Sequence, residues 1–196
     1  RTWTEDPKKR GGNAVTHLTF CLDTIRYLMS PREVKQVVAL TDVAGDPQGR
    51  DHKVAALLNF EGDTYAFAFN SHENNFGDCS IVVYGTEGRL SGIGTLSLGT
   101  RGELQILKVK GTRGLVGDIQ KKAFPFTTLT GLHYEGERSV TTIEFPGANM
   151  FVDEIEGFNK VIEEGGEPVC SGVDGLRCRE LCTAILKSSI EKRMVE

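Results

Sequence analysis

The sequence predicts an α+β protein built on one large, mainly antiparallel open sheet, with helices on one face of that sheet. Two observations lead to this fold class. The middle of the chain holds several short runs in which apolar residues alternate with a period of two, as they do in strands. Both ends of the chain hold segments in which apolar residues recur every three or four positions, as in amphipathic helices. The order of helix, many strands and two helices is typical of an α+β domain.

The first predicted helix spans residues 11–29, where two glycines precede a sustained helical pattern. We expect Asn13 to cap it, because a short polar side chain there can accept from a free backbone N–H of the first turn. We expect it to end before Pro31, because proline disfavours helical geometry in the preceding residue. The apolar stripe of this helix consists of Val15, Leu18, Leu22, Ile25 and Met29.

Strands are predicted next. Residues 33–42 are rich in valine, and residues 53–60 alternate with a period of two. A three-residue link containing glycine joins the second run to a third at 64–69, so these two runs are predicted to form an antiparallel hairpin. Further strands are predicted at 79–84, 89–90, 95–98, 103–109 and 140–145.

Three helices can cover only one face of such a sheet. In the third run Tyr65, Phe67 and Phe69 share one face, and Ala66 and Ala68 share the other. An aromatic row left in water would be unfavourable, and large exposed apolar patches usually mark interaction sites. The uncovered face is therefore predicted to be a protein interface or the wall of a ligand site.

The end of the chain is predicted to be helical. One helix covers 153–164 and stops at the glycine pair 165–166. A capping box at 171–174 begins another helix, which runs to about residue 192. We interpret Cys178 and Cys182 in its apolar stripe as small core residues, and we predict no metal site.

The glycine-rich stretch after residue 91 does not predict a phosphate-binding loop. Gly92 and Gly94 begin like a dinucleotide fingerprint, but Ser97 stands where the third glycine should be. The surrounding pattern is that of a strand, whereas the fingerprint needs a helix N-terminus. We therefore expect no cofactor to bind to this chain alone.

Composition limits the function further. A chain of 196 residues, 39% hydrophobic and 26% charged, is predicted to form one domain over residues 1–196. No apolar run approaches the ~20 residues that span a bilayer. The net charge is -4, with no basic cluster beyond residues 8–10, so neither a nucleic acid nor a membrane is expected as a partner. Five scattered cysteines are typical of a reduced, cytoplasmic protein.

Three stretches resemble one family, the glucose–fructose oxidoreductase and inositol dehydrogenase (Gfo/Idh/MocA) family. Residues 3–28 are similar to its tryptophan, glycine-rich turn and helix with an Arg-Tyr-Leu ending. Residues 81–90 resemble its strand-turn-strand with a Gly-Thr-Glu-Gly corner, and residues 154–195 resemble its closing helix pair. The resemblance covers essentially the whole chain, but only the second half of a family member.

This resemblance implies a glyceraldehyde-3-phosphate-dehydrogenase-like C-terminal domain that binds substrate and forms oligomers through its open sheet face. Family members bind NAD or NADP on an N-terminal Rossmann domain, which we expect to be absent from this chain. The parent protein would then be an NAD(P)-dependent oxidoreductase acting on a sugar, polyol or related hydroxy compound. Its expected partners are that small-molecule substrate, the missing Rossmann domain and a second copy of itself.

The resemblance departs from the family at the catalytic pair. Family dehydrogenases carry an aspartate and a histidine one helical turn apart beside the substrate. Alignment on Asp23 without a gap puts Thr16 and Phe20 at these places, and a shift of one residue puts His17 and Cys21 there. Neither alignment restores the pair.

His17 is the imidazole nearest the expected place and is the predicted catalytic residue, with a structural role against the sheet as the alternative. The predicted substrate-binding residues are Asn13, Thr16, Phe20 and Cys21. Surface positions in turns or at strand ends are predicted for His52, His72 and His133. The loss of the pair leaves a second hypothesis open, in which the protein is a non-catalytic sensor or interaction protein.

Overall fold

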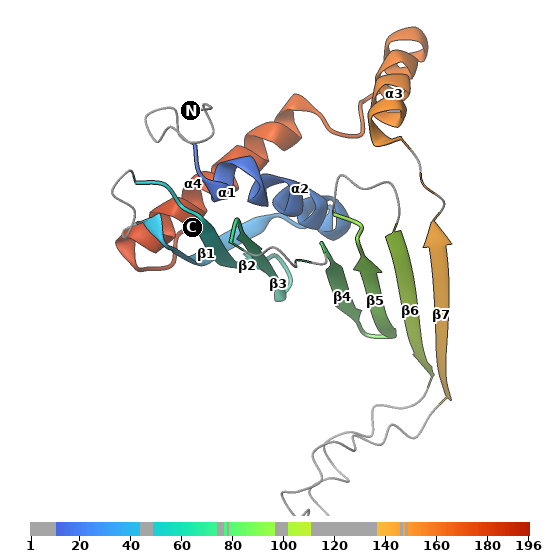
Figure 1. Ribbon diagram of the computed structural model, residues 1–196, viewed down its shortest axis with the longest axis horizontal. Coiled ribbons are helices and arrows are strands. Elements are labelled where there is room, and N and C mark those ends of the chain that lie inside the picture. Colours follow the sequence, from blue (N-terminus) through green and yellow to red (C-terminus); the bar gives the residue numbers. More distant parts are fainter. Residues whose placement is uncertain are drawn as a thin grey trace, which may run out of the picture. The chain divides into compact units, whose positions relative to one another are not determined.

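The computed structural model describes residues 11–43, 49–73, 77, 79–96, 102–110, 137–145, 147 and 149–196. The predicted α+β class is confirmed, since helices lie at both ends of the chain and every strand pair between them is antiparallel (Figure 1). The strands form two hydrogen-bonded sheets where one large sheet was predicted. The chain divides into two compact units, residues 1–77 with 151–196 and residues 78–150, and each is described by itself.

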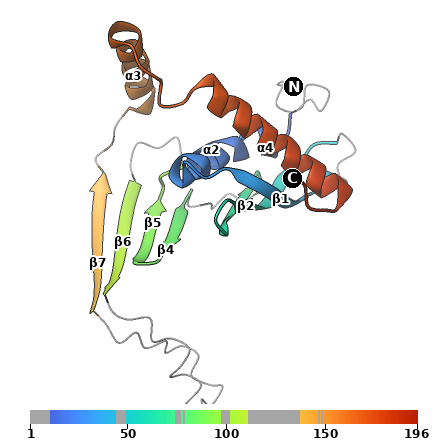
Figure 2. The same ribbon diagram turned by 180° about the vertical axis from the view of Figure 1, so that it is seen from behind.

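The first unit contains a three-stranded sheet in the order β1-β2-β3. Its strands are β1 (Val34–Thr41), β2 (Lys53–Phe60) and β3 (Thr64–Ser71), close to the predicted ranges. The β2–β3 hairpin closes where Phe60 pairs with Thr64, which confirms the three-residue link. Three helices pack against the sheet, namely α1 (Asn13–Thr16), α2 (Leu18–Met29) and α4 (Gly172–Glu191) (Figure 2).

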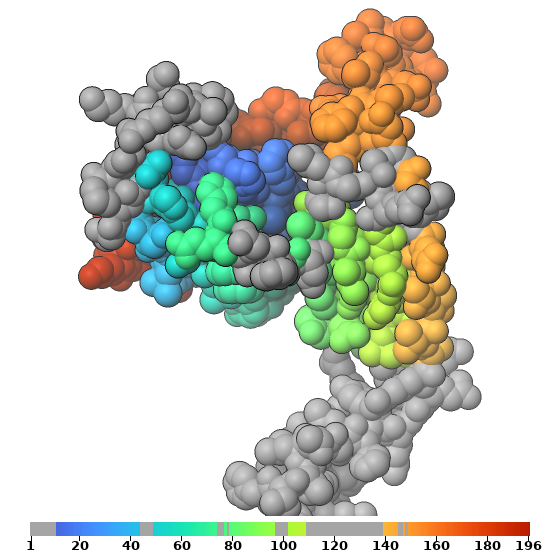
Figure 3. Space-filling view, in the orientation of Figure 1, coloured from blue at the N-terminus to red at the C-terminus, as the bar shows by residue number. Residues whose placement is uncertain are grey.

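The core of this unit lies between the sheet and these helices. In β2 the side chains of Val54, Ala56, Leu58 and Phe60 are buried, and the residues between them are more exposed. They meet buried residues of all three helices, including Leu18, Leu22 and Ile185. Each fully buried aliphatic or phenylalanine side chain contributes roughly 1.5–3 kcal/mol. This packing holds the helices on one face of the sheet. In Figure 3 the atoms of α1 and α2, in blue, lie directly beside the light blue to teal atoms of the segments that follow them in the sequence.

The other face of this sheet is exposed and apolar, as predicted. Tyr65, Phe67 and Phe69 are 62%, 67% and 50% exposed, whereas Ala68 between them is buried. The strand register extends this row across the sheet, because Leu57 pairs with Phe67 on one side and with Val38 on the other. Both of these aliphatic side chains are also exposed.

The remaining helix of this part of the chain, α3 (Met150–Glu164), has no buried residue. Its apolar side chains Phe151, Ile155, Phe158 and Ile162 form an exposed stripe at helical spacing. The helix α4 begins with the predicted capping box, in which the Ser171 hydroxyl accepts from the backbone N–H of Asp174.

The second unit is a four-stranded antiparallel meander in the order β4-β5-β6-β7. Its strands are β4 (Ile81–Gly85), β5 (Gly88–Ile93), β6 (Gly102–Lys110) and β7 (Glu137–Phe145). Gly92 lies within β5, as expected for a strand and not for a phosphate loop. The strand predicted at 95–98 is wrong at Thr95 and Leu96, which form a turn, and its last two residues lie outside the described ones. In the described part of the chain, no helix has the length and apolarity needed to cross a membrane.

Candidate functional site

The helix predicted over residues 11–29 is broken at His17. The short helix α1 ends at Thr16, and α2 begins at Leu18. His17 itself has φ -125° and ψ -46°, outside helical geometry, and its carbonyl accepts from the N–H of Phe20. Because His17 belongs to neither helix, its exposed imidazole is not part of the regular row of side chains on α1 or α2.

The start of α1 is held by Asp51, a residue 37 positions away. The Asp51 carboxylate accepts from the backbone N–H of Ala14 at 2.6 Å, and its carbonyl accepts from the N–H of Asn13 at 2.8 Å. The predicted cap by Asn13 is therefore wrong, because a distant carboxylate already occupies the first-turn donors. Asn13 is instead the first residue of α1, and its fully buried side chain donates to the carbonyl of His52 at 2.7 Å.

The carboxylate of Asp51 is almost completely buried, at 3% exposed. Burial raises its pKa, and the hydrogen bond from Ala14 opposes this rise. Gly12 makes room for the carboxylate, since a Cβ at this glycine would overlap Oδ1 of Asp51. Gly12 also has φ 137°, which side chains rarely adopt.

His17 is paired with His72, which lies just after β3. Nδ1 of His17 is 2.9 Å from Nε2 of His72, within hydrogen-bond distance. The two rings meet edge to face, with centroids 4.5 Å apart and an interplanar angle of 85°. A third imidazole, that of His52, lies with its centroid 6.5 Å from that of His72. The site thus consists of the hydrogen-bonded pair His17 and His72, with His52 beside His72.

The charges around His72 act in both directions. Partial burial lowers its pKa most, and the neighbouring His17 and His52 lower it further. Asp51 and Asp42 oppose this, because a nearby carboxylate favours the protonated imidazole. Burial raises the pKa of Asp42, but backbone N–H groups of Lys53 and His52 bind its carboxylate at 2.9 and 2.7 Å, and the net shift is downward.

The predicted site residues lie in different environments, some near His17 and others in the core. Thr16 lies beside His17, with its Oγ1 2.8 Å from Nδ1 of the ring. Phe20 is 64% exposed on the first turn of α2. Cys21 packs against the hydrophobic core, and Asn13 is buried under the loop that carries His52. Thr16 thus contacts His17 through its side chain.

Sequence reasoning missed the contribution of His52, His72 and Asp51. A signal for the two histidines was present in the predicted hairpin, because the register that pairs Lys53 with Ser71 also sets residue 52 opposite residue 72. The backbone confirms this, since the N–H of His72 donates to the carbonyl of His52 at 3.0 Å. His72 is exposed in a turn, as predicted, and His133 lies outside the described residues.

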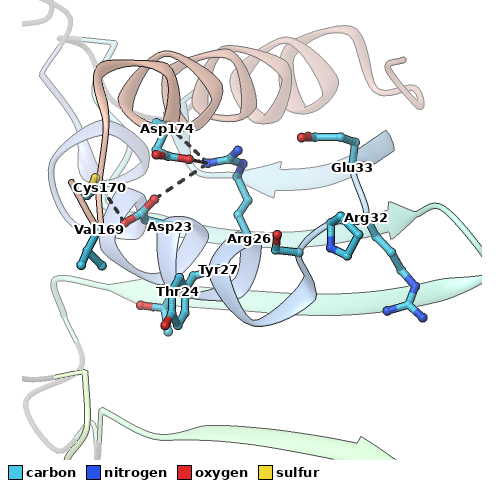
Figure 4. A pocket seen from close by; sticks show the side chains of 11 residues that line it. Asp23, Thr24, Arg26, Tyr27, Arg32, Glu33, Val169, Cys170 and Asp174 are labelled. Atoms are coloured by element: carbon cyan, nitrogen blue, oxygen red, sulfur yellow. Dashed lines mark hydrogen bonds and ion pairs between the residues drawn. The ribbon is translucent and has the colours of Figure 1, made fainter. Parts of the chain in front are cut away.

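A separate pocket of about 380 Å³ lies at the end of α2 (Figure 4). Arg26 points into the space between Asp23 and Asp174, and its Nη1 lies 3.9 and 3.5 Å from their carboxylates. Asp23 and Arg26 thus form an ion pair between residues three apart on α2. The pocket is lined by Asp23, Thr24, Arg26, Tyr27, Ser30, Pro31, Arg32, Glu33, Val169, Cys170 and Asp174.

The two thiols next to Asp23, Cys170 in this pocket and Cys178 on α4, are poor nucleophiles. Cys178 is buried and donates to Asp23 at 3.3 Å, and burial together with this carboxylate raises its pKa to about 11. Burial and Asp23 raise the pKa of Cys170 as well. Reactive cysteines need a lowered pKa, so the described pocket offers no activated thiol. Within the described ranges, no group of three or more His, Cys, Asp or Glu side chains could hold a metal ion.

Comparison with known proteins finds that this chain is similar to sugar and inositol oxidoreductases. Residues 1–91 match the family model of the GFO/IDH/MocA C-terminal domain. The chain is 22% identical over 196 residues to 1,5-anhydro-D-fructose reductase of Ensifer adhaerens, covering 99% of this chain and 50% of the relative. It is 26% identical over 121 residues to inositol 2-dehydrogenase of Rhizobium meliloti, covering 62% of this chain and 37% of the relative.

The same likeness is seen among solved structures. Levoglucosan dehydrogenase, solved in complex with NADH and L-sorbose, superposes with a TM-score of 0.73 at 18% identity. The match covers 100% of this chain and 52% of that one. This chain thus spans about half the length, or less, of the relatives that it matches.

Proposed function

We propose that this chain, which carries the C-terminal domain of the GFO/IDH/MocA family over residues 1–91, is the substrate-binding and oligomerisation domain of an NAD(P)-dependent oxidoreductase. Its substrate would be a sugar, a polyol or a related hydroxy compound. The names of the two curated relatives support this substrate class, since one is a reductase of an anhydro sugar and the other an inositol dehydrogenase.

The observation that carries the proposal is the contact between His17, at the break between α1 and α2, and His72, just after β3. Removal of a proton from a hydroxyl group needs a base with a pKa near the working pH, and histidine is the side chain that meets this requirement without perturbation. His17 is exposed and bonded to a second imidazole, so it can both reach a ligand and be oriented by its partner. Thr16 and Phe20 flank it on the two helices and would contact the substrate.

The described residues do not fit a dinucleotide. The glycines at 92 and 94 belong to a strand and the bend after it, and no described helix begins there to bind a pyrophosphate. We therefore assign no step of the reaction to NAD or NADP on this chain. In the proposal a Rossmann domain outside this chain binds the cofactor, which is supported by relatives of about twice its length.

The oligomerisation part of the proposal uses the open face of the β1-β2-β3 sheet. Its exposed row of Val38, Leu57 and Phe67 is flanked by Tyr65 and Phe69. A contiguous apolar surface of this kind is typical of a protein interface. We propose a homo-oligomer through this face, and a cytoplasmic location on the number and scatter of the five cysteines in the sequence.

A non-catalytic sensor is the second candidate, and a specific observation favours it. Cys21 occupies one of the two alignment places for the family histidine, and its side chain packs against the core. Phe20, at the other place, carries no titratable group. A protein of this kind would bind a polyol at the same surface without turning it over.

Turnover by the longer protein that contains this chain separates the two candidates. The assay measures reduction of NAD⁺ and NADP⁺ over a panel of sugars and polyols. An enzyme should lose about 10²-fold or more of kcat in the His17→Ala variant, since general acid–base groups contribute about that much. The exposed Arg177→Ala variant serves as the matched control. Saturable ligand binding without turnover in the unmodified protein would instead favour the sensor.

A thermal-shift titration tests the place of the cofactor site. A ligand that binds the native state must raise its stability. NAD(H) and NADP(H) should therefore leave the melting temperature of this chain unchanged and raise that of the longer protein. A clear shift with this chain alone would refute the assignment of the cofactor to another domain.

A further inference from the structure

The tautomer of His17 follows from the hydroxyl of Thr16. Thr16 Oγ1 donates its proton to the carbonyl of Gly12 at 2.7 Å, so the oxygen presents lone pairs to any other partner. Its second partner is Nδ1 of His17 at 2.8 Å. While the hydroxyl donates to Gly12 its oxygen can only accept, and this arrangement favours the tautomer of His17 with its proton on Nδ1. In the neutral ring, Nε2 is then the free base.

The same Nδ1–H is also directed toward His72. Nε2 of His72 lies 2.9 Å from it and accepts when His72 is neutral and carries its own proton on Nδ1. The pair is therefore arranged as donor and acceptor in one direction, from His17 to His72. The edge-to-face arrangement of the rings is compatible with such an in-plane hydrogen bond.

We propose that His72 is a proton-relay residue for His17, so that the two imidazoles together replace the Asp/His pair that this sequence lacks. The inference rests on the proposed function and deepens it. Nε2 of His17 takes the proton of a substrate hydroxyl while the proton on Nδ1 of His17 passes to Nε2 of His72. One proton enters the pair, one moves on within it, and no electrons are exchanged.

The groups around His72 act in both directions on the proton that it receives. Burial disfavours the imidazolium form of His72 most, and His17 on the helix side and His52 at the start of β2 disfavour it further. Asp51, buried at the start of α1, and Asp42, just after β1, both favour it, but the net shift of the His72 pKa is downward, so the proton is readily passed back. The Lys53–Glu73 ion pair beside the turn carries no net charge. Because two positive imidazoles in contact repel each other, protonation of one ring disfavours protonation of the other.

Nuclear magnetic resonance of the labelled chain tests this arrangement without substrate or cofactor. Two-bond ¹H–¹⁵N spectra report which ring nitrogen carries the proton, and we expect Nδ1–H for neutral His17. Protonation of one ring in a contacting pair changes the titration of the other. The titration curve of His72 should therefore move to higher pH in the His17→Gln variant, because His17 lowers the pKa of His72. The matched His52→Gln variant should move it less, since the centroid of the His52 ring is 6.5 Å away.

Two results overturn the relay. One is an identical titration curve of His72 in the unmodified chain and in His17→Gln. The other is a pH–rate profile of the longer protein that does not change in His72→Gln, because a merely structural partner would not move its acidic limb. If the titration is coupled but the longer protein turns over no sugar or polyol, the proposed function fails and the relay's role in catalysis fails with it. An uncoupled titration in an active enzyme removes the relay alone.

Discussion

Ser188 near the end of α4 binds the edge of β1, where its Oγ accepts from the backbone N–H of Ala39 at 3.0 Å. The same hydroxyl donates to the carbonyl of Arg193 at 2.6 Å. Ser189 accepts in the same way from the N–H of Thr41, and the carbonyl of Val195 accepts from the N–H of Val37. The C-terminal segment thus takes the place of a fourth strand along this edge, which would otherwise expose unpaired donors.

Replacement of Ser188 by alanine should destabilise the chain. The side chain is 1% exposed, so its loss leaves the N–H of Ala39 buried without a partner. An unsatisfied buried group costs about 1–3 kcal/mol. Urea denaturation should show this loss in Ser188→Ala, whereas exposed Thr183→Ala on the same helix should stay within about 0.5 kcal/mol. Equal midpoints for the two variants would contradict the role of Ser188.

Gly12→Ala should also destabilise the chain, because its Cβ would displace the carboxylate that caps α1. Backbone strain at φ 137° adds to this cost. We expect a loss of at least about 1 kcal/mol. Gly175 on α4 is the control, since nothing lies within 4 Å of a Cβ there and alanine in a helix is more stable than glycine by about 0.5–1 kcal/mol. Thermal denaturation that shifts both variants in the same direction would contradict this account.

The buried carboxylate of Asp51 predicts a pH dependence of stability. Burial raises its folded-state pKa above the ordinary 3.8, so the folded chain binds this proton more tightly than the unfolded chain. The contribution of Asp51 is then greatest at low pH and is lost as the pH rises from 3.8 through the raised pKa. In Asp51→Asn the residue at this position does not titrate, and the amide oxygen can still accept from Ala14. As the pH rises through this window, the free energy of unfolding of the unmodified chain should therefore fall relative to that of Asp51→Asn. A relative gain would contradict the raised pKa.

The open face of the β1-β2-β3 sheet predicts association. A charge at its centre should oppose burial of this face, so Phe67→Glu is expected to shift the chain toward monomer in sedimentation velocity at micromolar concentration. Val173→Glu is a matched control, because Val173 is similarly exposed at 63% but lies on α4. A monomer at all concentrations before any substitution would count against the interface.

The strands and the later helices were predictable because their signals are local. The alternation of β2 and β3 and the capping box of α4 each depend on residues within one element. The hydrogen bond at the start of α1 was not predictable in this way, since it comes from a carboxylate 37 residues from Ala14. The same holds for Ser188, whose hydroxyl binds the N–H of Ala39 from 149 residues away.

The candidate site was predicted only in part. His17 and Thr16 were named from the helical segment, and they are adjacent at the break. His72 became part of the site through the hairpin register and the turn after β3, which no local pattern of residues 11–29 reveals.

Ligand mapping by nuclear magnetic resonance tests the central claim most directly. Myo-inositol and L-sorbose would be titrated into the labelled chain and into the His17→Ala variant. The account predicts saturable shifts that centre on Thr16, His17, Phe20 and His72, and that weaken in the variant. Saturable shifts confined to the pocket around Arg26, or no saturable shift with any sugar or polyol, would contradict it.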